Sequence, residues 1–318
     1  AVFDTNFSAD LTIMEEGSEF VQRLTEGGEL PQITSCCPAW TDYMEKYYND
    51  MIPNFSSAKS PMMMQGALTK TYYAGKSGID PKDIYSVAIM PCTAKKFEIG
   101  RDENMMSSGY KDMDLVLTTR ELSRLIKASG IEFNTLPEEL ADSPIGAYAG
   151  AGTIFGNTGG VMEAAVRTAY NLVTGEEMED VNVEAVRGME GIRKGEIDIK
   201  GTKVKVAVAH GMANVSEILD EVRAARAAGS EPPYHFIEVM ACRGGCIAGG
   251  GQPYATTDEI RNKRIQGLYQ DDEQKAIRCS HENPEIRQIY SEFLGEPLSE
   301  KSHHLLHTTY QARPVYKR

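Results

Sequence analysis

The sequence lacks long apolar runs and clustered basic residues, and each absence excludes a class of protein. No apolar run approaches the roughly 20 residues that span a bilayer. The N-terminus also lacks the basic segment followed by an apolar one that is typical of a secretory signal. The 33 Lys and Arg are outnumbered by 46 Asp and Glu. The resulting net charge of -13 disfavours nucleic acid or an anionic lipid surface as a partner, so small neutral substrates and proteins fit better.

Cysteine is also scarce, with six residues in a chain of 318, two of them adjacent. Adjacent cysteines suit a disulfide scaffold poorly, so a metal or redox role is the better interpretation. The 41% hydrophobic and 25% charged residues are ordinary for a globular protein, and the length allows one large domain or two smaller lobes. Because Val2-Phe3-Asp4 resembles the end of a strand whose beginning is missing, we expect a further segment upstream.

Strand-like and helix-like segments alternate along the chain. Between Ser8 and Leu24 apolar residues recur at helical spacing, and Gly27-Gly28 supplies a stop. The expected strands are 32–35, 84–89, 115–117, 204–209 and 236–240, and the other expected helices are 40–48, 62–73, 119–126, 160–173 and 215–227. This alternation predicts an α/β fold with largely parallel sheets, whose ligands lie beyond the carboxyl ends of the strands. From residue 252 the chain becomes mostly helical and polar.

Five cysteines lie in three short segments, each at the end of an expected strand. The segments are Thr34-Ser35-Cys36-Cys37-Pro38-Ala39-Trp40, Met90-Pro91-Cys92-Thr93-Ala94-Lys95 and Met240-Ala241-Cys242-Arg243-Gly244-Gly245-Cys246. A cubane iron–sulfur cluster takes four thiolates, and the Gly244-Gly245 pair lets backbone approach a cofactor closely. Taken alone, however, Cys242 and Cys246 are equally compatible with a zinc or structural site.

The three segments together resemble the three signature motifs of the iron-only hydrogenase catalytic domain, in the expected order and over nearly the whole chain. The resemblance implies one catalytic domain over residues 1–318, with 252–318 as its helical C-terminal part. It implies two lobes, each a mostly parallel sheet flanked by helices, with the cluster in the cleft between them. The implied reaction is the reversible joining of two protons and two electrons into H2.

The same resemblance implies the cofactor and its ligands. Cys37, Cys92, Cys242 and Cys246 would hold a [4Fe–4S] cluster, and the sulfur of Cys246 would also bridge to a two-iron subcluster. That subcluster carries CO, cyanide and a bridging azadithiolate, and the two parts form the H-cluster. Dedicated maturation proteins would be needed to supply it.

A route for protons is implied as well. Cys36, left without iron, would pass protons through a water to Glu16, and Ser56, Glu19 and Arg23 would continue the route to the surface. Glu16, Glu19 and Arg23 are spaced by three and four residues, so they share one face of the first expected helix. Without the family, the two glutamates would be interpreted as a solvated face of that helix.

The resemblance assigns further residues to the pocket of the two-iron subcluster. Lys95 would donate to a cyanide, for which a compact ammonium is well suited; by itself it would be interpreted as an exposed lysine. The other pocket residues would be Ser60, Pro61, Met90, Met240, Phe155 and Gly156. By contrast, Met62-Met63-Met64 is interpreted as core packing.

The expected partners follow from what is missing. The sequence shows no nicotinamide or flavin site and no accessory four-cysteine runs, so an electron-transfer iron–sulfur domain or subunits of ferredoxin-like type must supply electrons. Arg243 stands where many relatives have proline, and this form resembles catalytic subunits of multi-subunit, NAD(P)-linked hydrogenases with flavin subunits. An anaerobe's cytoplasm is the expected location, with the periplasm as the alternative because some relatives are exported.

Two rival functions stay open at this stage. One is an H2 sensor that uses the same cluster, and the other is a catalytically idle iron–sulfur or assembly protein that keeps only the four ligands. Outside the motifs, Cys279 is interpreted as an ordinary thiol. His303, His304 and His307 are interpreted as part of a solvated C-terminal segment, with metal binding as the alternative.

Overall fold

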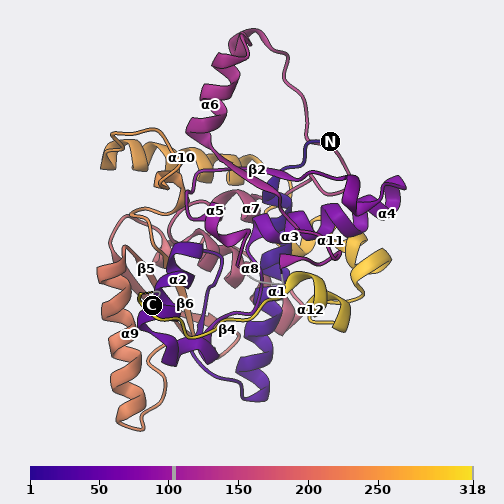
Figure 1. Cartoon of the computed structure of the whole chain (residues 1–318). Coiled ribbons are helices and arrows are strands. Elements are labelled where there is room, and N and C mark those ends of the chain that lie inside the picture. Colours follow the sequence, from indigo (N-terminus) through magenta and orange to yellow (C-terminus); the bar gives the residue numbers. More distant parts are fainter. Residues whose placement is uncertain (102–104, 317–318) are drawn as a thin grey trace.

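Two sheets of largely parallel strands form the framework of the computed structural model, which describes residues 1–101 and 105–316 (Figure 1). The strands are β1 (Gln32–Ile33), β2 (Val87–Met90), β3 (Leu115–Thr118), β4 (Ile192–Ile199), β5 (Thr202–His210) and β6 (Phe236–Met240). The α-helices are α1 (Thr5–Glu26), α2 (Pro38–Tyr47), α3 (Pro61–Leu68), α4 (Ala74–Ser77), α5 (Lys95–Glu98), α6 (Thr119–Ala128), α7 (Gly150–Ile154), α8 (Gly160–Thr174), α9 (Met212–Ala227), α10 (Asp258–Gln274), α11 (Pro284–Ile289) and α12 (Glu300–Leu306).

The larger sheet has the strand order β1-β6-β5-β4, and the smaller one pairs β2 with β3. β1, β6 and β5 are parallel, as are β2 and β3, so the prediction of largely parallel sheets is confirmed. β4 is antiparallel to β5 and was not expected from the sequence. Its residues 192–199 include Lys194, Gly195, Glu196 and Asp198, residue types that are depleted in strands, which gives a weak strand signal.

Strand β5 shows how the large sheet fills both of its faces. Val204, Val206 and Val208 pack in one core with residues of α1 and α8, whereas Ala207 and Ala209 pack in a second core with residues of α2 and α9. This alternation follows from the two-residue period of a strand. A sheet covered by helices on both faces leaves its carboxyl edge as the place where loops can gather.

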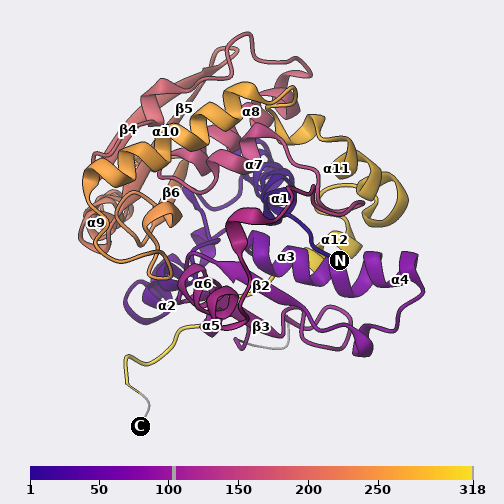
Figure 2. The same cartoon turned by 90° about the horizontal axis from the view of Figure 1, so that it is seen from above.

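Helix α1 runs through the middle of the molecule between the two sheets (Figures 1 and 2). The Asp4 side chain caps it by accepting a hydrogen bond from Asn6 N at 2.9 Å, and Gly27, at φ 87°, ends it in the left-handed region that favours glycine. The expectation that Val2–Asp4 ends a strand is therefore wrong, since these residues lead into the helix. Helix α1 packs against α3, α7 and α8, so it joins the two halves of the fold.

The small sheet differs from the expected strand over residues 84–89. Strand β2 begins at Val87, and Val87 and Ile89 are exposed while Ala88 and Met90 are buried. One face of this two-stranded sheet therefore packs on the core and the other faces solvent. The three methionines Met62 to Met64 are buried beneath it and beside α1, which confirms their core role.

The C-terminal segment, residues 258–316, packs against α1, α7 and α8 (Figure 2). Arg167 of α8 is fully buried and pairs with Glu163 of the same helix and with Asp272 of α10, each at 2.8 Å. Buried charges are tolerated only when paired in this way, so the network fixes the position of α10. No helix of the described residues has the length and apolar composition needed to cross a membrane.

Candidate metal centre and proton route

Cysteines from both sheets project from strand ends. Cys37 follows β1 and is the N-cap of α2, and Cys242 follows β6, the parallel neighbour of β1. Cys92 follows β2 of the small sheet, and Cys246 begins the short turn of residues 246–248. Because carboxyl ends of parallel strands meet at one edge, Cys37 and Cys242 are brought to the same edge of the large sheet.

Glycines bring the third cysteine segment against the second one. Gly251 N donates to Pro91 O at 2.7 Å, and a Cβ at Gly249 would lie 2.2 Å from that same oxygen. At Gly245, with φ 94°, a Cβ would lie 2.7 Å from Met240 Sδ and 2.8 Å from Thr158 N. Side chains at these positions would push the backbones apart, so glycine is required for the close approach of Cys246 to Cys92.

The thiols influence one another electrostatically. Burial raises the pKa of Cys242 to about 11, and the nearby thiols of Cys37 and Cys92 add to the effect. The surrounding protein atoms and the same two thiols likewise raise the pKa of Cys246, although this residue keeps exposed surface. Thiolates held this close need a strong positive charge to be stable, and iron supplies one. Four thiols with glycine backbone beside them therefore fit a cubane cluster.

A single-ion site is a poorer fit for these cysteines. Ligands of one ion crowd around it, whereas a cubane holds each of its four thiolates on a different iron. Within the described ranges, no three of these four thiols lie within 4.8 Å of one another, as donors to one ion would. The geometry thus disfavours the zinc alternative for Cys37, Cys92, Cys242 and Cys246.

Cys36 lies beside this group and its carbonyl accepts a hydrogen bond from Lys95 Nζ at 3.2 Å. Burial raises the pKa of the Cys36 thiol, and the carboxyl of Glu16 and the thiol of Cys246 raise it further, so the group keeps its proton near neutral pH. Lys95 is buried, and its Nζ also donates to Glu98 Oε2 at 2.8 Å. Burial opposes the ammonium form, but Glu98 outweighs it and raises the pKa of Lys95.

Glu16 of α1 is fully buried, and neither of its carboxyl oxygens makes a close hydrogen bond among the described residues, although the Ser56 hydroxyl and the Ser35 backbone lie near enough to lower its pKa. Burial raises its pKa to about 8, and the charge of Glu19 contributes in the same direction. A buried acid without partners is rare in native proteins. The interpretation of Glu16 and Glu19 as a solvated helix face is therefore wrong, since Glu19 is buried as well.

The other residues of the expected proton route are joined one to the next by hydrogen bonds. Ser56 Oγ donates to Glu19 Oε2 at 3.1 Å, and Arg23 Nη2 donates to Glu19 Oε1 at 2.6 Å. Arg23 also bonds to the carbonyls of Pro53 and Phe55, and its side chain keeps 16% exposure. Ser56, Glu19 and Arg23 thus form a connected path between the protein interior and its surface.

The expected pocket residues lie on elements that surround the cysteines. Ser60 is the buried N-cap of α3, its hydroxyl has no hydrogen-bond partner in the described part of the chain, and Pro61 is the first residue of that helix. The other four residues belong to strand ends and to the loop after α7: Met90, Met240, Phe155 and Gly156. Met240 and Phe155 share one hydrophobic cluster, and Gly156 O accepts from Ile247 N at 3.0 Å, next to Cys246.

Sequence reasoning missed a second polar chain on the buried side of Glu19. Ser57 N donates to Glu19 Oε2 at 3.0 Å, and Ser57 Oγ bonds to His307 Nδ1 at 2.8 Å. His307 Nε2 bonds in turn to Glu15 Oε2 at 2.9 Å. The interpretation of His307 as part of a solvated segment is therefore wrong; His303 and His304 are exposed as expected.

Two family models match the chain. Residues 1–250 match the iron only hydrogenase large subunit, C-terminal domain, and residues 258–313 match the iron hydrogenase small subunit. The chain belongs to the iron-only hydrogenase family. The NADP-reducing hydrogenase subunit HndD of Solidesulfovibrio fructosivorans is 50% identical over 98% of the chain and 53% of its own length. The chain thus spans about half the length of this curated relative.

Solved structures and more distant relatives agree with this placement. An [FeFe]-hydrogenase HydA1 variant from Chlamydomonas reinhardtii is 44% identical, with a TM-score of 0.84 over 98% of this chain and 85% of that one. Cytosolic iron-sulfur assembly component 3 of Rattus norvegicus is 32% identical over 98% of this chain and 66% of its length. The higher identities are to hydrogenases, and the overall fold is that of [FeFe]-hydrogenases.

Proposed function

We propose that this chain is the catalytic domain of an iron-only hydrogenase, which interconverts H2 with two protons and two electrons by heterolytic cleavage or formation. Cys37, Cys92, Cys242 and Cys246 would hold the [4Fe–4S] cluster, with Cys246 also bridging to a two-iron subcluster that bears CO, cyanide and an azadithiolate. When bound, this H-cluster supplies the redox centre and the metal and amine positions for the chemistry of H2.

The observation that carries the proposal is the fully buried carboxyl of Glu16, which has no close hydrogen bond among the described residues and keeps a raised pKa despite the nearby Ser56 hydroxyl. A protein that only stores or assembles clusters gains nothing from an orphaned buried acid, which destabilises the fold. A proton route does need one, because a group with a pKa of about 8 both binds and releases protons near neutral pH. This observation favours hydrogenase function over an assembly role.

The chain's own residues have distinct roles in proton movement. The protonated thiol of Cys36 would exchange protons with Glu16 through one water, because no direct hydrogen bond joins the two side chains. Ser56 would relay the proton to Glu19, with which it shares a 3.1 Å hydrogen bond, and Arg23 would hold the Glu19 carboxylate at the exit. Lys95 would donate to cyanide and, through its bond to the Cys36 carbonyl, fix the backbone at the start of the route.

Electrons would reach the [4Fe–4S] cluster from iron–sulfur domains or subunits outside this chain. The relative HndD is named as a subunit of an NADP-reducing hydrogenase, which supports NAD(P)-linked partners of this kind. The need for maturation proteins and a cytoplasmic or periplasmic location stay predictions from the resemblance.

Activity is tested on the chain after maturation, with a chemically reduced one-electron carrier as donor. We expect H2 evolution that depends on the two-iron subcluster and is absent before maturation. Fully matured protein that neither forms nor consumes H2 would contradict the proposal.

A further inference from the structure

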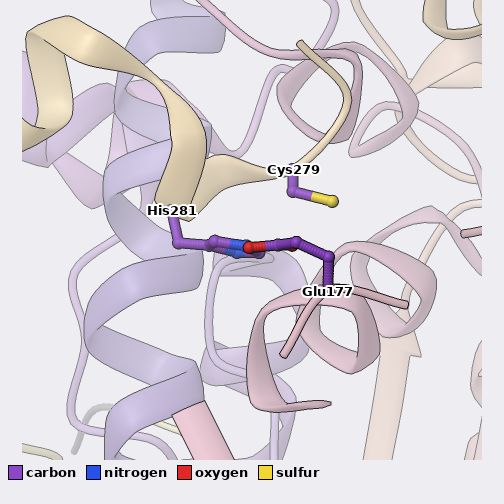
Figure 3. A group of neighbouring side chains, drawn as sticks. All are labelled: Glu177, Cys279 and His281. Atoms are coloured by element: carbon purple, nitrogen blue, oxygen red, sulfur yellow. The ribbon is translucent and has the colours of Figure 1, made fainter. Parts of the chain in front are cut away.

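Three side chains of metal-binding type meet beside α8, and none of them is a motif cysteine (Figure 3). Glu177 lies in the loop that follows α8, whereas Cys279 and His281 lie at the turn η8 (Ser280–Glu282) of the C-terminal segment. One carboxylate oxygen, one thiol sulfur and one imidazole nitrogen lie within 4.8 Å of one another. Cys279 and His281 are buried, whereas Glu177 is exposed to solvent.

Two residues of α8 contact the candidate ligands and orient them. Asn171 Nδ2 donates to Glu177 Oε1 at 2.8 Å, and His281 Nδ1 lies 3.3 Å from Thr168 Oγ1, which is fully buried. Both outer contacts leave the inner atoms, Glu177 Oε2 and His281 Nε2, facing each other at 2.8 Å. Outer hydrogen bonds of this kind orient histidine and carboxylate ligands in metal sites.

The inner pair needs either a proton or a metal cation between or beside its atoms. When Nδ1–H donates to Thr168, the lone pair of His281 Nε2 points at the lone pairs of the Glu177 carboxylate, which is repulsive. A cation next to the Cys279 sulfur would remove this repulsion by binding all three atoms. A proton on Nε2 would relieve the pair as well, but it gives no role to the sulfur.

We propose that Glu177, Cys279 and His281 bind a divalent zinc ion, with water as the fourth ligand. Thiolate, imidazole and carboxylate are the donor types that zinc takes in tetrahedral sites. The charges also balance, because one carboxylate and one thiolate neutralise the two positive charges of the ion. Cys279 would release its proton to solvent on binding.

The position of this site gives the ion a structural role. Glu177 belongs to the part of the chain that matches the large subunit, and Cys279 and His281 belong to the part that matches the small subunit. A zinc ion would therefore cross-link the two parts, next to the buried Arg167–Asp272 pair. It would stabilise the docking of the C-terminal segment rather than take part in H2 chemistry.

The test uses the full chain with its iron–sulfur cluster loaded, so that the four motif cysteines cannot bind added zinc. After dialysis against Zn²⁺, elemental analysis should find about one zinc per wild-type chain. Cys279→Ser and Glu177→Gln should lose most of it, with unchanged iron content. Glu177 is half exposed, so its variant leaves the fold intact even if Cys279→Ser perturbs it. Zinc should also raise the thermal unfolding midpoint of the wild type but of neither variant.

His304→Gln is the matched control, because His304 is exposed and outside the group, and it should bind zinc as the wild type does. Cobalt(II) is a second probe, since a thiolate ligand gives a charge-transfer band that Cys279→Ser should abolish. Equal zinc in the wild type and both variants, or no zinc in any of them, would overturn the proposal. Neither result would bear on hydrogenase activity.

Discussion

Ser56 Oγ donates a hydrogen bond to Glu19 Oε2 at 3.1 Å, although 37 residues separate them in the chain. The contact joins the loop before α3 to the central helix α1, on the side of that helix that also carries the buried Glu16. Arg23 donates to the other oxygen of Glu19, and Ser57 N is a third donor to the same carboxylate. Each residue of this hydrogen-bonded part of the proposed proton route can be substituted separately.

Cys36→Ala tests the first step of that route. Cys36 is proposed to move protons and not to bind iron, so the variant should keep the full iron content. Its H2 evolution should fall by about 100-fold or more, the usual loss when a positioned proton donor is removed. Iron analysis and H2 assays of matured protein check both halves. Loss of iron in this variant would instead make Cys36 a ligand.

Glu19→Gln tests the exit of the route. Gln keeps the size of the side chain and the contacts to Ser56 and Arg23, but it cannot bind a proton as a carboxylate does. H2 evolution should slow on the order of 100-fold, while the infrared bands of the cofactor stay unchanged. Glu26→Gln is the matched control, because Glu26 is exposed at the end of the same helix. Equal rates in both variants would remove Glu19 from the route.

Glu16→Gln tests the buried acid through stability instead of rate. Burial raises the Glu16 pKa from its ordinary value of 4.5 to about 8, so the folded state binds a proton that the unfolded state releases between these values. The wild type therefore loses stability as pH rises from about 5 to about 8. Gln has no proton to lose, so the variant should gain on the order of 4 kcal/mol relative to the wild type across this range.

Denaturant unfolding of both proteins at pH 5, 6.5 and 8 measures this difference. Other groups whose pKa is raised, such as Asp10 with a pKa of about 6, are present in both proteins, so their effect on the pH dependence of stability cancels in the comparison. A stability difference that does not change with pH would show that Glu16 is ionised in the fold.

His307→Gln tests the second polar chain. His307 and neighbouring hydrogen bonds hold the Glu15 pKa below its ordinary value against the effect of burial, so Glu15 loses its main partner in the variant. Removing one member of a buried pair typically destabilises a protein by about 3–5 kcal/mol. The loss of stability in His307→Gln should lie at the low end of this range, because Gln can still hydrogen-bond to Glu15. Thermal unfolding checks this. His304→Gln, on the exposed face of α12, should stay within about 0.5 kcal/mol of the wild type.

The sequence predicted the strands β5 and β6 and the cysteine segments well, because short apolar runs followed by Cys, Pro or Gly are local signals. Burial of Glu16 and Glu19 had no local signal, since an acidic helix face is usually solvated. The contacts of Glu15 with His307 join residues that are 292 positions apart. Only the packed structure can show such pairs, and the same holds for the group of Glu177, Cys279 and His281.

The central claim is that four thiols from separate strand ends hold one cluster while Cys36 beside them stays free. Infrared spectroscopy of matured protein, combined with iron and sulfide analysis, tests it most directly. The account predicts bands of CO and cyanide together with a [4Fe–4S] cluster and two further irons, and loss of the [4Fe–4S] cluster in Cys37→Ser but not in Cys36→Ser. A protein that contains zinc without sulfide, or whose iron is retained in Cys37→Ser, would contradict the account.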